Sequence, residues 1–141
     1  MPISLEQAWD FFSDPKNLKT ITPDKMGFKI TNDLEGRKMY PGQLITYKVS
    51  PILGIPMTWV TEITQVSDQK YFVDEQRFGP YTMWHHTHFF EEVEGGTMCT
   101  DEVYYKVPLG FLGSIANSVM VKAQLEQIFS FREKKLKELF G

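Results

Sequence analysis

Residues 57–107, which read MTWVTEITQVSDQKYFVDEQRFGPYTMWHHTHFFEEVEGGTMCTDEVYYKV, decide the fold of this 141-residue chain. Through most of this stretch apolar or aromatic residues alternate with polar ones, a pattern typical of strands with one buried face. Gly79-Pro80 and Glu94-Gly95 interrupt the alternation and predict short turns. Strands joined by short turns pair antiparallel, because a parallel pair needs a crossover of about a dozen residues. The stretch therefore predicts an antiparallel meander.

The remaining sequence adds two strands and the helices. In all, the patterns predict six strands, at about 27–31, 43–50, 57–66, 70–78, 82–92 and 97–107. Ser4 with Gln7 predicts a capped helix to Ser13, which Asp14-Pro15 ends, and a second short helical turn is expected at 17–21. After Pro108 the apolar period becomes 3.6 and predicts a C-terminal helix of about eight turns. Its apolar stripe contains Ile115, Val121, Leu125, Ile128, Phe129, Leu136 and Leu139.

These elements predict an α+β fold of one domain over residues 1–141, because this length is typical of a single domain. A curved antiparallel sheet that wraps around one long amphipathic helix buries both apolar faces. Where the sheet and the helix diverge, this arrangement leaves room for a cavity.

Composition excludes several classes of function. The net charge of -3 and the pI near 5.6 provide no basic surface for nucleic acid. No apolar run approaches the roughly 20 residues of a membrane span, so stable membrane insertion is not expected. Cys99 is the only cysteine, so no internal disulfide can form, and a cytoplasmic location is expected. We expect Cys99 to be a buried structural thiol rather than a nucleophile.

Four short strings resemble those of the START-like superfamily, also called SRPBCC, whose helix-grip domains include the birch-pollen-allergen type. The strings are Phe11 to Leu18, Asp74 to Pro80, Trp84 to His88, and Gly96-Thr97 leading to Asp101. The resemblance covers nearly the whole chain and is nearest to a bacterial branch whose members carry names such as cell division inhibitor or polyketide cyclase. It implies a helix-grip fold and the binding of lipids, sterols or polyketides.

Domains of that superfamily normally begin with a strand, whereas here the first helix pattern starts almost at Met1. We therefore expect that the usual first strand is missing and that the chosen start lies inside the natural gene. An unpaired sheet edge, or the apolar loops, would then favour a homodimer.

Strand alternation places a polar group on the inner face of the predicted sheet. Trp84, His86, His88 and Phe90 share one face, as do Phe72, Asp74, Gln76 and Phe78 on the preceding strand and Thr97, Cys99, Asp101, Val103 and Tyr105 on the following strand. The predicted turns bring Asp74 opposite His86, and Asp101 opposite His88. Each histidine would then have a carboxylate partner inside the curve.

Two interpretations of this group remain open. In the first, His86, His88, Asp74, Asp101, Gln76 and Tyr105 orient a ligand oxygen inside an apolar pocket, whose wall includes Trp59, Ile63, Trp84, Phe90 and Phe129. In the second, the polar side chains form an internal hydrogen-bond network that holds the strands in register. His86 and His88 with an aspartate could also bind zinc, but the carboxylates already account for both histidines, so we expect no metal and no other cofactor.

Three apolar connections are expected at one end of the sheet, at 51–56, 79–81 and 108–112, whereas the opposite connections are polar. They form either an apolar mouth for a ligand, membrane or partner, or a packed cover over the core. The leading functional expectation is the binding of a small hydrophobic molecule. The alternatives are a cyclase or dehydratase that uses a His-Asp pair, with His86 or His88 as base, and a protein-interaction or regulatory module.

Overall fold

The computed structural model describes residues 1–50, 54–108 and 114–141 and has the α+β helix-grip architecture that the sequence predicts. The chain begins with helix α1 (Leu5–Phe12) and two single 3-10 turns, η1 (Pro15–Leu18) and η2 (Asp24–Met26). Six strands and one long helix follow: β1 (Lys29–Ile30), β2 (Leu44–Val49), β3 (Met57–Ser67), β4 (Tyr71–Phe78), β5 (Met83–Val93), β6 (Gly96–Lys106) and α2 (Ser114–Phe140).

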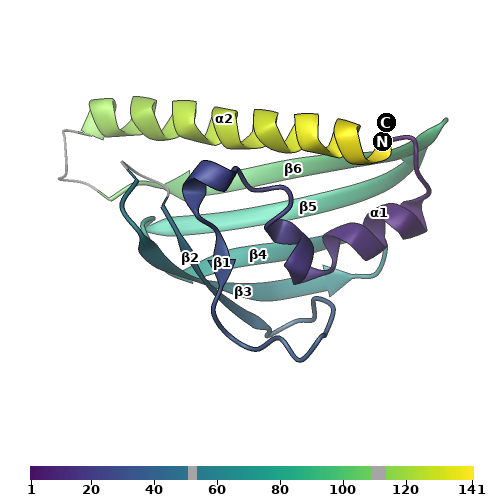
Figure 1. The fold of residues 1–141 in the computed structure, drawn as a ribbon, viewed down its shortest axis with the longest axis horizontal. Helices are drawn as coiled ribbons and strands as arrows, with labels where there is room; N and C mark the ends of the chain where they lie inside the picture. The colour runs from purple at the N-terminus through teal and green to yellow at the C-terminus, as the bar shows by residue number, and fades with distance from the viewer. Residues whose placement is uncertain (51–53, 109–113) are drawn as a thin grey trace.

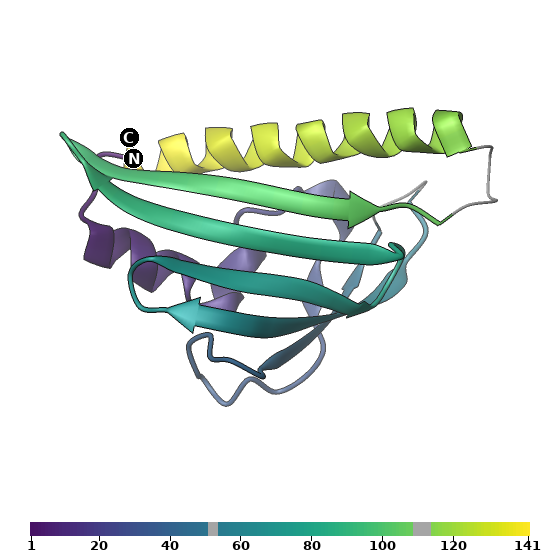
Figure 2. The ribbon, with the colours of Figure 1, turned by 180° about the vertical axis from the view of Figure 1, so that it is seen from behind.

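The six strands form one antiparallel sheet in chain order, which confirms the predicted meander. The sheet is curved, and α2 runs along its concave side, while α1 lies on the same side near the C-terminal end of α2 (Figure 1). Seen from behind, the long strands β3 to β6 form the outer layer (Figure 2). In the described part of the chain, no helix is both long and apolar enough to span a membrane.

The first turn of helix α1 is stabilised by a reciprocal capping box between Ser4 and Gln7. The Ser4 hydroxyl accepts a hydrogen bond from the Gln7 backbone N–H at 3.2 Å, and the Gln7 side-chain oxygen accepts one from the Ser4 backbone N–H at 3.0 Å. The inner face of the helix buries Ala8, Trp9 and Phe12 against the sheet. The Trp9 ring packs edge-to-face on Phe72 and Phe90, which fixes α1 over β4 and β5.

The strand register is as predicted at both places that matter for the site. Asp74 lies opposite His86, and His88 lies opposite Asp101. Between β5 and β6 the turn is tight, and Gly95 occupies the left-handed region with φ 83° that glycine adopts without strain. The turn therefore fixes which side chains of β5 and β6 face each other.

One inward residue was predicted wrongly. Phe78 is 65 % exposed, because β4 contains a register shift between its pairings Gln76–Thr61 and Phe78–Val60. The extra residue, Arg77, reverses the alternation beyond it, so Phe78 lies with Val60 on the outer face.

The apolar stripe of α2 is also shorter than predicted. Val121 is fully buried and Leu125, Ile128 and Leu136 pack on the core, whereas Leu139 is 45 % exposed. At this end Phe140 rather than Leu139 faces the body of the protein, where its ring lies 5.1 Å from that of Phe11. The side chain of Ile115 lies outside the described part of the structure.

The N-terminal segment lies along the start of β6, at the edge of the sheet. Met1 donates its terminal amine to the Thr97 carbonyl at 2.9 Å, and the Thr97 N–H donates to the Met1 carbonyl at the same distance. The Thr97 hydroxyl donates to the Ile3 carbonyl at 2.9 Å. Residues 1–3 are not part of a strand, but they pair this part of the edge, so the expectation of a wholly unpaired edge is wrong here.

We expect Gly96→Ala to destabilise the protein more than Gly95→Ala. A Cβ at Gly96 would meet the Met1 carbonyl oxygen, which belongs to the backbone and cannot rotate away, whereas a Cβ at Gly95 meets open space. Gly95→Ala should cost about 1 kcal/mol from the left-handed conformation alone. Gly96→Ala should cost about 2 kcal/mol or more and loosen the Thr97 amide. Urea unfolding and amide hydrogen exchange measure both effects, and equal losses for the two variants would contradict the pairing.

Candidate functional site

A cavity of about 130 Å³ lies between α2 and the concave face of the sheet. Most of its wall is apolar, and aromatic rings make up much of it: Phe28, Tyr47, Trp59, Phe72, Tyr81, Trp84 and Phe129. Apart from the tyrosines, its charged and titratable lining residues are Asp74, His86 and His88 from the strands and Arg132 from α2. An apolar space with a few convergent polar groups is the usual form of a small-molecule site.

The aromatic wall is fixed by ring-to-ring packing. Trp59 stacks on Tyr47 with a centroid distance of 5.8 Å and meets Trp84 edge-on at 5.5 Å. Tyr81 packs on both tryptophans, because it follows Gly79-Pro80 and turns back over the strand ends. Its backbone is held by the Gln76 side chain, which accepts from the Tyr81 N–H at 3.0 Å and donates to the Tyr81 carbonyl at 2.7 Å.

Two histidines and two aspartates form a four-membered cluster that crosses the strands diagonally. His88 Nε2 donates to Asp74 Oδ2 at 2.6 Å, and His86 Nε2 donates to Asp101 Oδ1 at 2.8 Å. The second nitrogen of each ring also faces a carboxylate: His86 Nδ1 lies 3.4 Å from Asp74 Oδ2, and His88 Nδ1 lies 3.0 Å from Asp101 Oδ1. The other Asp74 oxygen accepts from the Trp84 indole at 3.2 Å.

The rings of this cluster are stacked as well as hydrogen-bonded. The His86 and His88 centroids are 3.7 Å apart, and His88 lies on Phe72 at 4.2 Å with nearly parallel planes. His88 is thus enclosed between Phe72 and His86, while His86 meets the edge of Phe129 on the cavity side at 5.8 Å. Both histidine side chains are almost fully buried.

Burial and neighbouring charges separate the two histidines. Burial lowers the pKa of His86, and the charge of His88 lowers it further. Burial acts in the same direction on His88, but the contacts with Asp101 and Asp74 outweigh it and raise the His88 pKa. Of the two rings, His88 is therefore the one that is protonated more readily.

The carboxylates stay ionised for the complementary reason. Burial alone would raise the pKa of Asp74 and Asp101, but the charges and hydrogen bonds of His86 and His88 lower both. The guanidinium of Arg132, whose Nη1 lies 3.9 Å from Asp101 Oδ1, adds a positive charge beside the two carboxylates.

Arg132 is the functional candidate that the sequence analysis missed. Its side chain is 12 % exposed, its Nη1 lies 3.9 Å from Asp101 Oδ1, and its guanidinium carbon lies 5.2 Å from the centre of the Phe129 ring. The available signal was its spacing, because Arg132 follows Ile128 by four residues and Phe129 by three and so belongs to the apolar stripe of α2. The several lysines of this helix hid that signal.

The predicted site residues divide into those that line the cavity and those that do not. Trp59, Ile63, Asp74, Trp84, His86, His88 and Phe129 line the cavity. Gln76 holds the Tyr81 backbone, Tyr105 packs behind Trp84, and Phe90 belongs to the core under α1. Asp101 lies outside the cavity and lines a second hollow of about 480 Å³ between the N-terminal segment and the end of α2, a hollow that Phe129 and Arg132 also border.

The set Asp74, His86 and His88 has the composition of a metal site, with ligand atoms within 4.8 Å of one another. The distance of 2.6 Å between His88 Nε2 and Asp74 Oδ2 is that of a short hydrogen bond. Two ligands bound to one zinc ion at about 2.0–2.1 Å would lie farther apart than this. The arrangement therefore fits a proton between these atoms better than a metal ion.

Cys99 is half-buried, and burial followed by the charge of Asp101 raises its pKa to about 12. Such a thiol stays protonated and is a poor nucleophile, in agreement with the structural role that we expect. At the apolar end of the sheet, Ile55 is 57 % exposed, while Ile52, Leu53 and residues 109–112 lie outside the described residues. Tyr81 is turned inward, so of the three predicted apolar loops the 79–81 connection covers the core.

No family model and no curated protein matches this chain. Several solved structures have a similar fold. Protein Ms6760 from Mycobacterium smegmatis matches with a TM-score of 0.68 and 19 % identity over 99 % of this chain and 85 % of its own. Protein NE0264 from Nitrosomonas europaea matches with a TM-score of 0.64 and 15 % identity over 98 % of this chain and 90 % of its own.

A third match is part of a larger protein. The nucleoside-diphosphate sugar epimerase from Corynebacterium glutamicum has a TM-score of 0.65 and 20 % identity over 98 % of this chain, which covers only 27 % of the epimerase. At these identities the likeness supports the fold alone.

We expect the two buried histidines to titrate on opposite sides of the ordinary value of 6.5, with His88 above it and His86 below it. The reason is that both nitrogens of His88 face carboxylates closely, whereas protonation of His86 would place a second charge 3.7 Å from the first ring. Nitrogen-detected NMR of labelled histidine as a function of pH measures both values. A higher pKa for His86 than for His88 would contradict this assignment.

His88→Phe should lower the free energy of unfolding by about 3 kcal/mol near pH 6, because it leaves two buried carboxylates short of a partner. Since the His88 pKa is raised on folding, its contribution is complete below 6.5 and is lost as the pH rises through the folded value. The loss caused by the substitution should therefore shrink at pH 9. His85→Phe is the control, because His85 lies on the outer face and its side chain is 36 % exposed. Urea unfolding at both pH values makes the comparison.

Proposed function

We propose that this protein binds a small hydrophobic molecule in the cavity between the sheet and α2. The observation that carries the proposal is the aromatic wall. Its side chains, from β2, β3, β5 and α2 among other elements, surround a space of about 130 Å³ without filling it. A dry apolar cavity of about 150 Å³ is large enough to hold benzene. One aromatic ring, or a chain of similar volume, would fill this one, and a short polar tail on it would extend toward the outer hollow of about 480 Å³ that Phe129 and Arg132 also border.

Two further observations support the proposal. Asp74, His86, His88 and Arg132 are a small polar part of an otherwise mostly apolar wall, so an occupant with one polar end has a preferred orientation. The sequence strings that resemble START-like proteins point the same way, because that resemblance implies a lipid-, isoprenoid- or polyketide-like ligand. The fold neighbours support the helix-grip architecture and leave the ligand open.

The cyclase or dehydratase alternative requires a histidine that can accept a proton from a substrate. In this cluster all four imidazole nitrogens face carboxylate oxygens within 3.4 Å, and the cavity side of His86 presents its ring to the edge of Phe129. A general base needs a lone pair within reach of the substrate proton. The geometry therefore favours binding over catalysis, and it offers no specific support for a regulatory module.

We expect Ile128→Trp to abolish binding of the neutral probe 3-phenylpropanol, because Ile128 lines the cavity and the larger ring occupies it. Val119→Trp is the matched control, since Val119 lies on the same helix and is 65 % exposed. Ligand-observed NMR and calorimetry measure the binding, and near-UV circular dichroism shows that each variant keeps its packing.

Native mass spectrometry of protein purified gently from its own host identifies a natural occupant in the same preparation. If the unsubstituted protein bound no more 3-phenylpropanol than Ile128→Trp and carried no small molecule, the proposal would be wrong. Conversion of a bound molecule by the protein would favour the enzyme alternative.

A further inference from the structure

Among the described residues, three that line the cavity have buried polar atoms without a hydrogen bond: the Trp59 indole N–H, the Nε and Nη1 groups of Arg132, and His88 Nδ1. His88 Nδ1 lies 3.0 Å from a carboxylate oxygen of Asp101, whereas the Trp59 and Arg132 groups are donors with no acceptor within hydrogen-bond distance. Indole and guanidinium groups can donate but not accept, so only an acceptor can satisfy them.

Arg132 contributes its charge to the cluster but no hydrogen bond from Nε or Nη1. Its nearest carboxylate oxygen, Asp101 Oδ1, lies 3.9 Å from Nη1, which is beyond hydrogen-bond distance. That oxygen already accepts from His86 at 2.8 Å and lies 3.0 Å from His88. A buried donor on a charged group without an acceptor costs about 1–3 kcal/mol or more, so an occupant that supplies one would be bound tightly.

The surroundings of Arg132 hold the guanidinium ready for such an occupant. Asp101 stands on one side of it, the Phe129 ring lies against it, and both the inner cavity and the outer hollow reach it. Asp74 also lines the cavity, but its two oxygens accept from Trp84 and His88, and the cluster balances its charge. The polar atoms of the cavity wall that still lack an acceptor are therefore the N–H donors of Arg132 and Trp59.

We propose that the cavity binds an apolar acid, a molecule with one aromatic ring or a chain of similar volume and a carboxylate that accepts hydrogen bonds from Arg132. The ring or chain lies against Trp59, Trp84 and Phe129, and the carboxylate lies against Arg132, which borders both the cavity and the outer hollow. Charge-assisted hydrogen bonds from guanidinium to carboxylate are among the strongest that a side chain makes. This inference rests on the proposed function and specifies the chemical class of its ligand.

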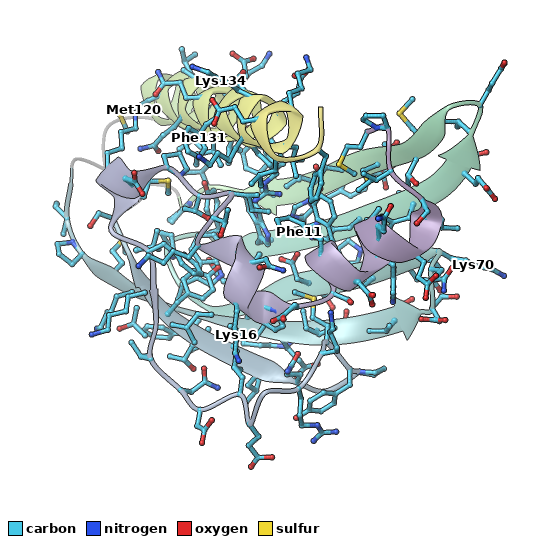
Figure 3. The ribbon with its side chains drawn as sticks, turned by 45° about the vertical axis from the view of Figure 1, so that its right-hand side comes forward. Phe11, Lys16, Lys70, Met120, Phe131 and Lys134 are labelled. Atoms are coloured by element: carbon cyan, nitrogen blue, oxygen red, sulfur yellow. The ribbon has the colours of Figure 1, made fainter. Side chains whose placement is uncertain are left out.

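Three probes with one common ring and chain test the inference: 3-phenylpropanoate, 3-phenylpropanol and 3-phenylpropylammonium. At pH 7.5 we expect the unsubstituted protein to bind the carboxylate about tenfold more tightly than the alcohol, and the ammonium ion least tightly. Arg132→Gln should remove the preference for the carboxylate and change the affinity for the alcohol little. Lys134→Gln should keep the preference. This substitution also removes one positive charge, but from the side of α2 that faces away from the sheet (Figure 3).

A second measurement does not depend on the folding of any variant. In protein labelled with 15N-arginine, addition of 3-phenylpropanoate should shift the Arg132 Nε–H signal, whereas 3-phenylpropanol should not. Equal affinity of the unsubstituted protein for the carboxylate and the alcohol, or tighter binding of the ammonium ion, would overturn the inference and leave the proposed function intact. Failure of all three probes to bind would overturn both.

Discussion

The structure depends on one electrostatic constraint: the concave face of the sheet holds two carboxylates, whose side chains are 17 % and 28 % exposed, beside two almost fully buried histidines. Asp74 and Asp101 stand on β4 and β6, and the strand between them carries His86 and His88 on the same face. A buried carboxylate without a donor or a counter-charge is strongly destabilising. The two histidines meet this requirement only if β5 pairs with both neighbours in the observed register, because a slip by one residue would move both rings to the outer face. The cluster therefore fixes β4 and β5, which form part of the cavity wall, and holds β6 in register beside them.

The diagonal contacts make this constraint stronger than two separate pairs would. His88 bonds to Asp74 and His86 bonds to Asp101, so each bond crosses from one strand to a residue two positions along its neighbour. Displacement of β4 or β6 against β5 would disturb all four members together. Such a network is rigid, and rigidity at this place holds the aromatic wall of Trp59 and Trp84 open instead of letting it collapse into the space above the strands.

The sequence predicted the parts of this arrangement that follow from periodicity. Alternation of apolar and polar residues predicted the strands, and the tight turn at Glu94-Gly95 predicted that His88 lies opposite Asp101. The sequence could not reveal that each histidine bonds to the aspartate diagonally across from it, because the hydrogen-bond partner depends on side-chain rotamers and on sheet twist. Nor could it place Phe78, since the register shift beside it follows from pairing with β3, which alternation within β4 does not reveal. Arg132 was hidden for a different reason: a cation in a lysine-rich helix looks like part of the solvated face until the packing of α2 on the sheet is known.

The two interpretations of the polar group that the sequence left open apply to different residues. His86, His88, Asp74 and Asp101 satisfy one another almost completely, which is the expected state of a structural network. Arg132 adds a positive charge beside the two aspartates, yet it stands too far from Asp101 to use its hydrogen bonds there. The network uses the charge of Arg132 but not its Nε and Nη1 donors. Those donors are therefore free for an acceptor in the adjoining cavity. If the cavity binds an apolar acid as proposed, the group that orients the ligand is Arg132 of the helix, the histidine–aspartate network of the sheet is structural, and the acceptor oxygen lies between them.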